Sequence, residues 1–105
     1  MTQAPAFPDE VQPFSVEGAN VRGRLVRLGS TFSHIIEPHS YPDAVVRMMG
    51  QTCALTAALA NALKYDGIFI LQTQSEGPLS MMVADIVSGG GMRGYARYDA
   101  EAFQG

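Results

Sequence analysis

The sequence of 105 residues contains a single cysteine, Cys53. One cysteine excludes an internal disulfide and a zinc site built from several cysteines. A chain of this length has room for one domain with a modest hydrophobic core. The simplest compartment for a protein without disulfides is a reducing cytoplasm, and we expect a cytoplasmic location.

Charged side chains are also scarce, at 16% of the chain, with a net charge of −3. The basic residues are dispersed apart from Arg22, Arg24 and Arg27, so the basic patch that nucleic-acid binding needs is lacking. The low charge leaves two interpretations equally open. Either some surface is hidden against a partner or a further part of the chain, or the interior is rich in alanine and methionine.

Long uninterrupted apolar runs are absent, which argues against a membrane span. The first residues contain prolines and no basic segment of the kind that begins a signal peptide. We expect residues 1–10 to form a flexible tail and residues 11–105 to form a single domain. Polar or charged residues interrupt the longest helical pattern at Asp43, Arg47, Gln51, Asn61 and Lys64.

Hydrophobic periodicity and turn residues divide the rest of the chain into strands and two helices. Short connections between the last three strands favour an antiparallel meander. The predicted fold class is therefore α+β, a meander with a long central helix and a short helix packed between or against sheet layers. The predicted strands are Gln12–Val16, Asn20–Leu28, Ile68–Gln74, Leu79–Val87 and Met92–Tyr98, and the short helix follows a cap at Gly29-Ser30 and ends before Pro38.

The long helix is predicted from Pro42, where proline suits the first position, to Tyr65. It has a bulky apolar stripe and, on another side, a seam of small residues. A helix that is apolar on two sides is usually buried on both, so we expect it to lie clamped between two layers. The stripe is Val45, Met48, Met49, Thr52, Leu55, Leu59, Ala62 and Leu63, and the seam is Gly50, Cys53, Ala57 and Ala60.

Residue patterns that carry chemistry are weak here, and we predict no catalytic, cofactor-binding or metal-binding residue. The run from Gly89 to Gly94 matches G-x-G-x-x-G, but a strand is expected to follow it where a dinucleotide site needs a helix. His34 and His39 are wrongly spaced for one helical face and lack a third ligand. Cys53 lies on the small seam and is expected to be a buried structural thiol. Asp66 and Asp85 do not form a convincing acid–base pair.

Methionine is frequent in the two central parts of the chain. Flexible thioether side chains suit a surface that must accept many apolar shapes. Core filling is the favoured interpretation, and a binding surface is the alternative. The residues concerned are Met48, Met49, Met81, Met82 and Met92.

Several short motifs, in a fixed order, resemble the N-terminal part of a known family. The long helix opens at Tyr41-Pro42 and closes at Leu63-Lys64-Tyr65-Asp66-Gly67, and turns follow at Gly77-Pro78. Together they are similar to the redox-regulated holdase chaperones of the heat shock protein 33 family. The other matching residues are Phe14, Val21-Arg22-Gly23, Leu25-Val26, Ile35-Ile36, Val45, Gln72, Met92-Arg93-Gly94 and Ala96-Arg97.

This resemblance implies an ATP-independent chaperone that binds unfolding client proteins under oxidative stress and forms homo-oligomers. It assigns a structural role to the motif residues, since the family's zinc-binding cysteines lie in a C-terminal region. None of those cysteines is present, so the resemblance implies a fragment without a zinc cofactor. Gln51 is neutral near a position where the family commonly has glutamate.

Two further hypotheses belong to other classes of protein. The first is a small dimerisation or protein-binding module without chaperone activity, since exposed strand edges favour association. The second is an enzyme that uses Cys53, which would require a thiol that is accessible and ionised.

Overall fold

The structure is a computed structural model that describes residues 9–63, 65–88 and 90–103. These residues form the predicted α+β architecture, with two antiparallel sheets and two α-helices. In chain order the elements are β1 (Glu10–Val16), β2 (Val21–Arg27), α1 (Ser30–Ile36), α2 (Asp43–Ala62), β3 (Ile68–Gln74), β4 (Leu79–Val87), β5 (Met92–Tyr98) and a short 3-10 helix, η1 (Ala100–Phe103).

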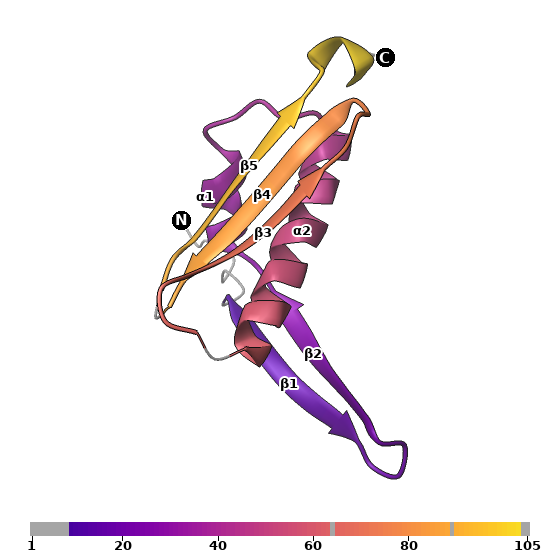
Figure 1. Ribbon diagram of the computed structural model, residues 1–105, viewed down its shortest axis with the longest axis vertical. Helices are drawn as coiled ribbons and strands as arrows, with labels where there is room; N and C mark the ends of the chain where they lie inside the picture. The colour runs from indigo at the N-terminus through magenta and orange to yellow at the C-terminus, as the bar shows by residue number, and fades with distance from the viewer. Residues whose placement is uncertain (1–8, 64, 89, 104–105) are drawn as a thin grey trace, which may run out of the picture.

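The three C-terminal strands form the predicted meander, in the order β3-β4-β5, and β1 and β2 form a separate hairpin. Figure 1 shows α1 and α2 behind the three-stranded sheet, with α1 beside β5 and the hairpin extending away from the sheet. The C-terminal end of α2 reaches the hairpin, where Arg24 Nε donates a hydrogen bond of 3.0 Å to Asn61 Oδ1. The front face of the sheet carries no helix in the described part of the chain.

The register of the meander decides which side chains face the helices. Leu71 pairs with Ala84, and Ala84 pairs with Gly94, so these three residues share one face. Gly94 lies directly against Ile35 of α1 and Met49 of α2, which identifies that face as the helix side. Because side chains alternate along a strand, the row Ile70, Asp85 and Arg93 lies on the opposite, outer face.

The hydrophobic core lies between α2 and the helix side of the sheet. Val45, Met49 and Cys53 on α2 are fully buried against Ala84 of β4 and Ala96 of β5. Thr52 and Thr56 are also buried, and their hydroxyls donate to the carbonyls of Met48 and Thr52 one turn earlier, at 2.9 and 2.6 Å. The buried face of α2 therefore combines Cys53 of the seam with Val45, Met49 and Thr52 of the stripe.

The expectation that α2 lies clamped between two layers is wrong. Three residues of its seam are buried, Cys53, Ala57 and Ala60, but part of the bulky stripe is exposed: Met48 by 43%, Leu55 by 52% and Leu59 by 37%. The physical reason is that a single sheet covers one side of the helix, and the hairpin reaches only its C-terminal end. A 20-residue helix with two apolar sides thus has only one partner layer among the described residues.

Both ends of α2 differ from the prediction. The helix begins at Asp43, with Pro42 as its N-cap residue, and it ends at Ala62 because Leu63 adopts an extended conformation. The predicted helical turn through Tyr65 is therefore wrong, and Lys64 lies outside the described residues. Gly67 has a φ of +114°, which a residue with a side chain rarely adopts, so glycine is required where β3 begins.

The start of α1 confirms the position of the cap that the sequence indicated at Gly29-Ser30. Gly29 is the N-cap residue and has no side chain to satisfy the first amides. The carboxylate of Asp9 does so instead, accepting from the Gly29 and Thr31 amides at 2.6 and 3.3 Å and from the Thr31 hydroxyl at 2.6 Å. Strand β1 correspondingly begins at Glu10 rather than at Gln12, and Asp9 just before it is tied to α1.

Candidate protein-binding surface

The edge of the sheet at β5 is closed by the loop that leads into α2. Tyr41 Oη accepts a hydrogen bond of 3.0 Å from the backbone N–H of Ala96. His39 stacks on the Tyr41 ring with 4.6 Å between centroids, and its edge meets Tyr95 at 5.6 Å. Burial raises the pKa of the Tyr41 hydroxyl, which keeps it protonated beside the strand. Tyr41, a motif residue, thus covers an edge amide.

Gly94 explains how closely the helices approach β5. A Cβ atom at this position would lie 3.0 Å from Ile35 Cγ2 and 3.0 Å from Met49 Cε. Such distances are tighter than ordinary van der Waals contacts, so a larger residue would push α1 or α2 away. Side chains of Ile35 and Met49 therefore occupy the space that a side chain at Gly94 would need.

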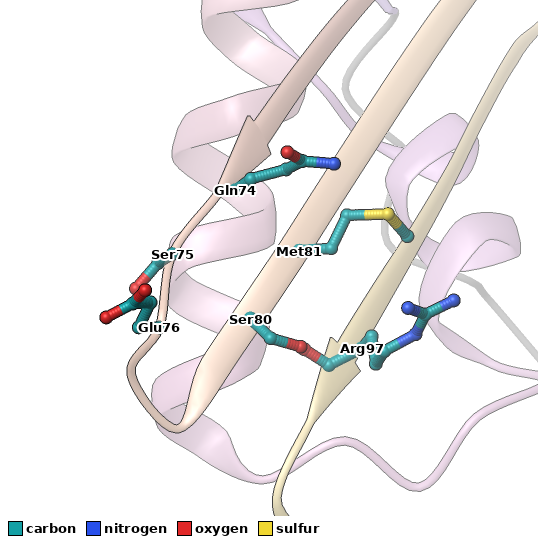
Figure 2. A pocket seen from close by; sticks show the side chains of 6 residues that line it. All are labelled: Gln74, Ser75, Glu76, Ser80, Met81 and Arg97. Carbon is teal, nitrogen blue, oxygen red and sulfur yellow. The ribbon is translucent and has the colours of Figure 1, made fainter.

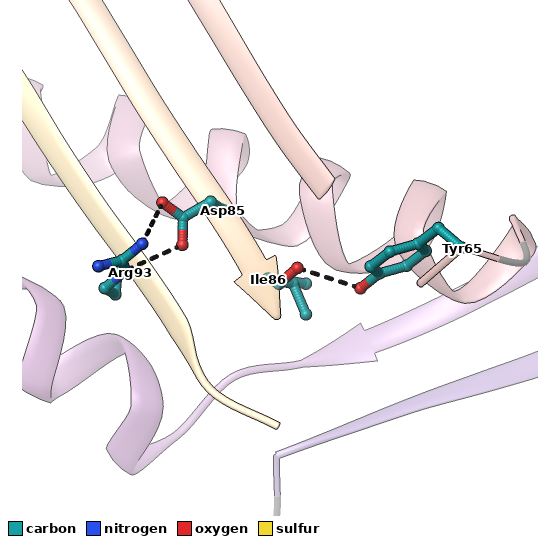
Figure 3. Close-up of polar contacts among 4 residues, drawn as sticks. All are labelled: Tyr65, Asp85, Ile86 and Arg93. Atoms are coloured by element: carbon teal, nitrogen blue, oxygen red, sulfur yellow. Dashed lines mark hydrogen bonds and ion pairs between the residues drawn. The ribbon is translucent and has the colours of Figure 1, made fainter. Parts of the chain in front are cut away.

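Two polar contacts fix the ends of β4 and β5, as Figure 3 shows. Arg93 forms an ion pair with Asp85 across the outer face, with 3.1 Å between Nε and Oδ1. Tyr65 Oη donates to the Ile86 carbonyl at 3.2 Å and so ties the segment after α2 to the sheet. Asp66, next to Tyr65, is exposed in the bend before β3. Asp66 and Asp85 therefore have different surroundings, and Asp85 has a cationic partner.

The turn at Gly77-Pro78 is held by one hydrogen bond to a side chain and one between backbone groups. The Gly77 amide donates to Ser75 Oγ at 2.9 Å, and the Pro78 carbonyl accepts from the Asp99 amide at 2.7 Å. These contacts connect the β3–β4 turn to the end of β5. The assignment of these motif positions to a structural role stays a prediction, because no comparison tests it residue by residue.

The remaining candidates for chemistry lie apart from one another. Cys53 is fully buried, and desolvation raises the pKa of its thiol to about 11. His34 is exposed on α1, while His39 lies among the tyrosines. Within residues 9–63, 65–88 and 90–103, no three His, Cys, Asp or Glu side chains gather as a metal site. The residues present therefore do not fit zinc.

The outer face of the sheet is partly apolar and open. Its exposed apolar side chains are Ile68 (51%), Ile70 (58%), Val87 (40%) and Tyr95 (45%). Near the β3–β4 turn, Gln74, Met81 and Arg97 form a row across the three strands beside an open hollow of about 360 Å³ (Figure 2). Figure 2 shows the thioether of Met81 between the amide and the guanidinium group. This face can contact apolar side chains of another polypeptide.

A second apolar surface lies on the flank of α2 next to β3. Met48, Thr73 and Pro78 line a hollow of about 500 Å³ between the start of α2 and the end of β3, together with Met82 and Phe103. Leu55 and Leu59 continue this flank along the helix. The methionines support both interpretations. Met49 fills the core, Met48 lines an open hollow, and the buried Met82 borders both.

Sequence reasoning missed the flank because it assigned the bulky stripe of α2 to the core. One available signal was that Ile68–Gln74 contains no charged residue and no proline, the residues that usually protect an exposed strand edge. The first strand of a three-stranded meander is also an edge strand unless another segment pairs with it. Both observations pointed to β3 as an unprotected edge.

No helix of the described residues is long and apolar enough to cross a membrane. The G-x-G-x-x-G match leads into β5, as expected, so it does not begin a helix that could hold a pyrophosphate. Gly89, its first residue, lies outside the described residues.

Comparison with known proteins identifies the family. A 33 kDa chaperonin of Caulobacter vibrioides is 42% identical over 93 residues, which are 89% of this chain and 31% of that protein. One from Ectopseudomonas mendocina is 40% identical over 89% of this chain and 32% of its own length. One from Nitrosococcus oceani is 39% identical over 92% of this chain and 34% of its own length. This chain spans about a third of these relatives, and because residues 9–104 match the family of the Hsp33 protein, it belongs to that family.

Proposed function

We propose that this chain contributes client-binding surface to an ATP-independent holdase chaperone, a protein that binds unfolding polypeptides and keeps them from aggregating. Similar proteins carry the name 33 kDa chaperonin, and this chain spans about a third of their length. The observation that carries the proposal is the number of large apolar side chains left exposed on one flank and on the outer face of the sheet. They include Met48, Leu55, Leu59, Ile68 and Ile70.

The magnitude of this surface fits reversible binding. A client that buries roughly 300 Å² of apolar surface gains about 7 kcal/mol before any cost is subtracted. Ordering the client and losing its free motion offset much of that gain. Binding of modest net affinity allows an unfolding protein to be held and later released.

The proposed activity is non-enzymatic and needs no group outside the chain. The buried Cys53 thiol, with a pKa of about 11, is a poor nucleophile at neutral pH. The family resemblance implies redox regulation through several cysteines, of which these 105 residues contain only Cys53, so we propose that binding by these residues is independent of redox state. We place the protein in the cytoplasm, with unfolding proteins and further copies of itself as partners.

An aggregation assay tests the proposal directly. Citrate synthase is heated at about 43 °C with increasing amounts of the 105-residue chain, and light scattering is recorded. We expect suppression that grows with the molar ratio and is equal with and without peroxide. Full aggregation at a tenfold excess of the chain contradicts holdase activity, and activation only by peroxide contradicts redox independence.

A second candidate is a dimerisation or protein-binding module without chaperone activity. The observation that favours it is the same exposed apolar flank, since such surfaces also mediate association between copies. Light scattering of the chain alone over a hundredfold range of concentration separates the two candidates. A dimer that forms at low concentration and fails to suppress aggregation supports the module, and a monomer that suppresses aggregation supports the chaperone.

A further inference from the structure

The two edges of the three-stranded sheet differ in whether their outward backbone groups have partners. In the β4–β5 ladder, Val87 N–H donates to the Gly91 carbonyl, which fixes the alternation of hydrogen-bonded pairs. By that alternation the N–H and C=O of Gly94 and Ala96 point away from β4. The Tyr41 hydroxyl takes the Ala96 amide, and Ile35 of α1 packs on the helix side of the strand at Gly94. One outward amide of the β5 edge is therefore occupied, and α1 packs beside it.

The same reasoning applied to β3 gives the opposite result. Ser75 N–H donates to the Ser80 carbonyl at 2.9 Å, and Ser88 N–H donates to the Gly67 carbonyl at 2.7 Å. These two bonds mark the inward-facing residues, so the alternate residues between them face outward. In the described part of the chain no hydrogen bond occupies their backbone groups, which belong to Ile68, Ile70, Gln72 and Gln74.

The exposed flank of α2 lies beside this same edge. Phe32 of α1 packs over Gly50, which places the β5 side of α2 on the face that carries Gly50. Met48 lines the hollow with Thr73 of β3, so the β3 side of α2 carries Met48. Leu55 and Leu59 lie two and three turns further along the face of Met48, given 3.6 residues per turn. Figure 1 shows α2 extending past β3 on this side.

We propose that β3 is a β-augmentation edge, which takes an extended, uncharged segment of a non-native polypeptide as a fourth strand. The segment's backbone bonds to the outward groups of Ile68, Ile70, Gln72 and Gln74. One row of its side chains lies on Met48, Leu55 and Leu59, and the other row continues the outer face beyond Ile70. Main-chain bonds of this kind bind many sequences, because every residue except proline offers them. This inference rests on the proposed holdase function and names the conformation in which a client binds.

The size and charge of the site favour such a segment over a second copy of the chain. Seven residues of β3 form a strip about 24 Å long and one strand wide, well below the roughly 800 Å² per partner of a stable dimer. The strip and the three α2 side chains beside it contain no charged residue, so they offer nothing to pair with a charged partner. A small, uncharged site that binds through backbone hydrogen bonds is suited to an extended apolar segment that is bound for a short time.

Hydrogen exchange measured by NMR on the 105-residue chain tests the inference at single amides. The probe is reduced, carboxymethylated α-lactalbumin, which stays unfolded without denaturant. At saturating probe we expect the exchange of the Ile68, Ile70, Gln72 and Gln74 amides to slow by at least about fivefold, since opening must precede exchange. The Ala96 amide on the opposite edge serves as the internal control and should not change.

Two matched pairs of variants test the same edge by binding of fluorescent probe. Ile70→Pro removes an outward N–H, which an edge strand tolerates, and Ile70→Val keeps it. Gln72→Lys places a charge on the edge, and Gln12→Lys places the same charge on the exposed strand β1. We expect Ile70→Pro and Gln72→Lys to weaken binding at least about fivefold, with the two controls near wild type. Amide spectra confirm that each variant is folded, and Gln72→Lys keeps the test valid if Ile70→Pro unfolds.

The outcomes separate this inference from the proposed function. If the probe binds and aggregation is suppressed, but the β3 amides are unprotected and Gln72→Lys binds normally, the edge proposal is wrong and holdase function stands. If the probe does not bind at all, both are overturned. If the β3 amides are protected without probe and lose protection on dilution, the occupant is a second copy and the edge proposal is overturned in favour of self-association.

Discussion

The two edges of the three-stranded sheet face opposite conditions within one small domain. At β5, the Tyr41 hydroxyl takes an outward amide, and α1 packs closely against Gly94. At β3, the outward amides of Ile70 and its alternate neighbours face solvent beside an exposed apolar helix flank. The same sheet thus has one edge that is protected against pairing with another strand and one edge that is open to it. Protection of an edge therefore depends on the side chains beside it and not on the sheet as a whole.

Replacing each of two adjacent methionines on α2 tests the contrast between the β5 side and the β3 side, and it should give the largest change in the free energy of unfolding. Met49 is fully buried on the β5 side, while Met48 is 43% exposed on the β3 side. Met49→Ala should lower the free energy of unfolding by about 3 kcal/mol, because it leaves a cavity in the core. Met48→Ala should change it by less than about 1 kcal/mol. Urea titration measures both, and equal losses would show that the β3 flank is as tightly packed as the β5 side.

Removing the cover of the β5 edge should have the next largest effect. Tyr41→Phe leaves the Ala96 amide without its partner in a nearly fully buried residue, so we expect a loss of about 1.5 kcal/mol. Exchange of the Ala96 amide should become faster by about tenfold, in line with that loss. Tyr98→Phe is the control, since its hydroxyl makes only a long 3.4 Å bond to the Ser40 carbonyl. An unchanged Ala96 amide would mean that Tyr41 does not protect this edge.

Asp9 supplies a smaller and pH-dependent contribution at the start of α1. Its hydrogen bond from the Thr31 hydroxyl, together with those from the Gly29 and Thr31 amides, lowers the pKa of the carboxyl group. The folded state therefore favours the ionised form, so the contribution is present above about pH 4 and is lost as pH falls through the lowered pKa.

Asp9→Ala should cost about 1 kcal/mol at neutral pH, as loss of a capping side chain does. The difference from wild type should shrink as the pH is lowered below about 4. Thermal unfolding between pH 7 and pH 2.5 measures this, with Glu17→Gln in the β1–β2 turn as a control for removing a carboxylate. A difference that persists unchanged at the lowest pH would contradict a role for the ionised form.

The smallest effect is expected for the ion pair on the outer face. The Arg93 side chain is 72% exposed and that of Asp85 only 17%, and water and salt reach the pair from the arginine side, which keeps its contribution small. Arg93→Ala should cost about 0.5 kcal/mol, and the difference should fade in 0.5 M salt at roughly a 4 Å Debye length. Unfolding in urea at low and high salt measures it. A loss above about 2 kcal/mol would mean that the outer face is more shielded than the structure indicates.

Local sequence signals predicted most elements, because hydrophobic period and turn residues act over a few neighbours. The strands of the meander were found at their observed bounds, and Gly67 was correctly placed in the turn before β3. The end of α2 was missed because Leu63 and Tyr65 are compatible with a helix, while the structure draws Tyr65 to the Ile86 carbonyl on another strand.

The open flank required knowledge of how the elements meet. The sequence shows Leu55 and Leu59 as part of an apolar stripe, but burial depends on whether a second layer is present. The same limit applies to Asp9, whose partners Gly29 and Thr31 are distant in the chain. Contacts of this type cannot be inferred from periodicity, because periodicity describes one element at a time.

The rate at which the Cys53 thiol is labelled reports how often α2 separates from the sheet. The thiol is fully buried, and its pKa of about 11 leaves very little thiolate at neutral pH. An alkylating reagent can therefore modify it only during the brief intervals in which the core opens. The rate of labelling by iodoacetamide, divided by the rate in urea, gives the fraction of time that the core is open. The measurement needs no dye and no engineered residue.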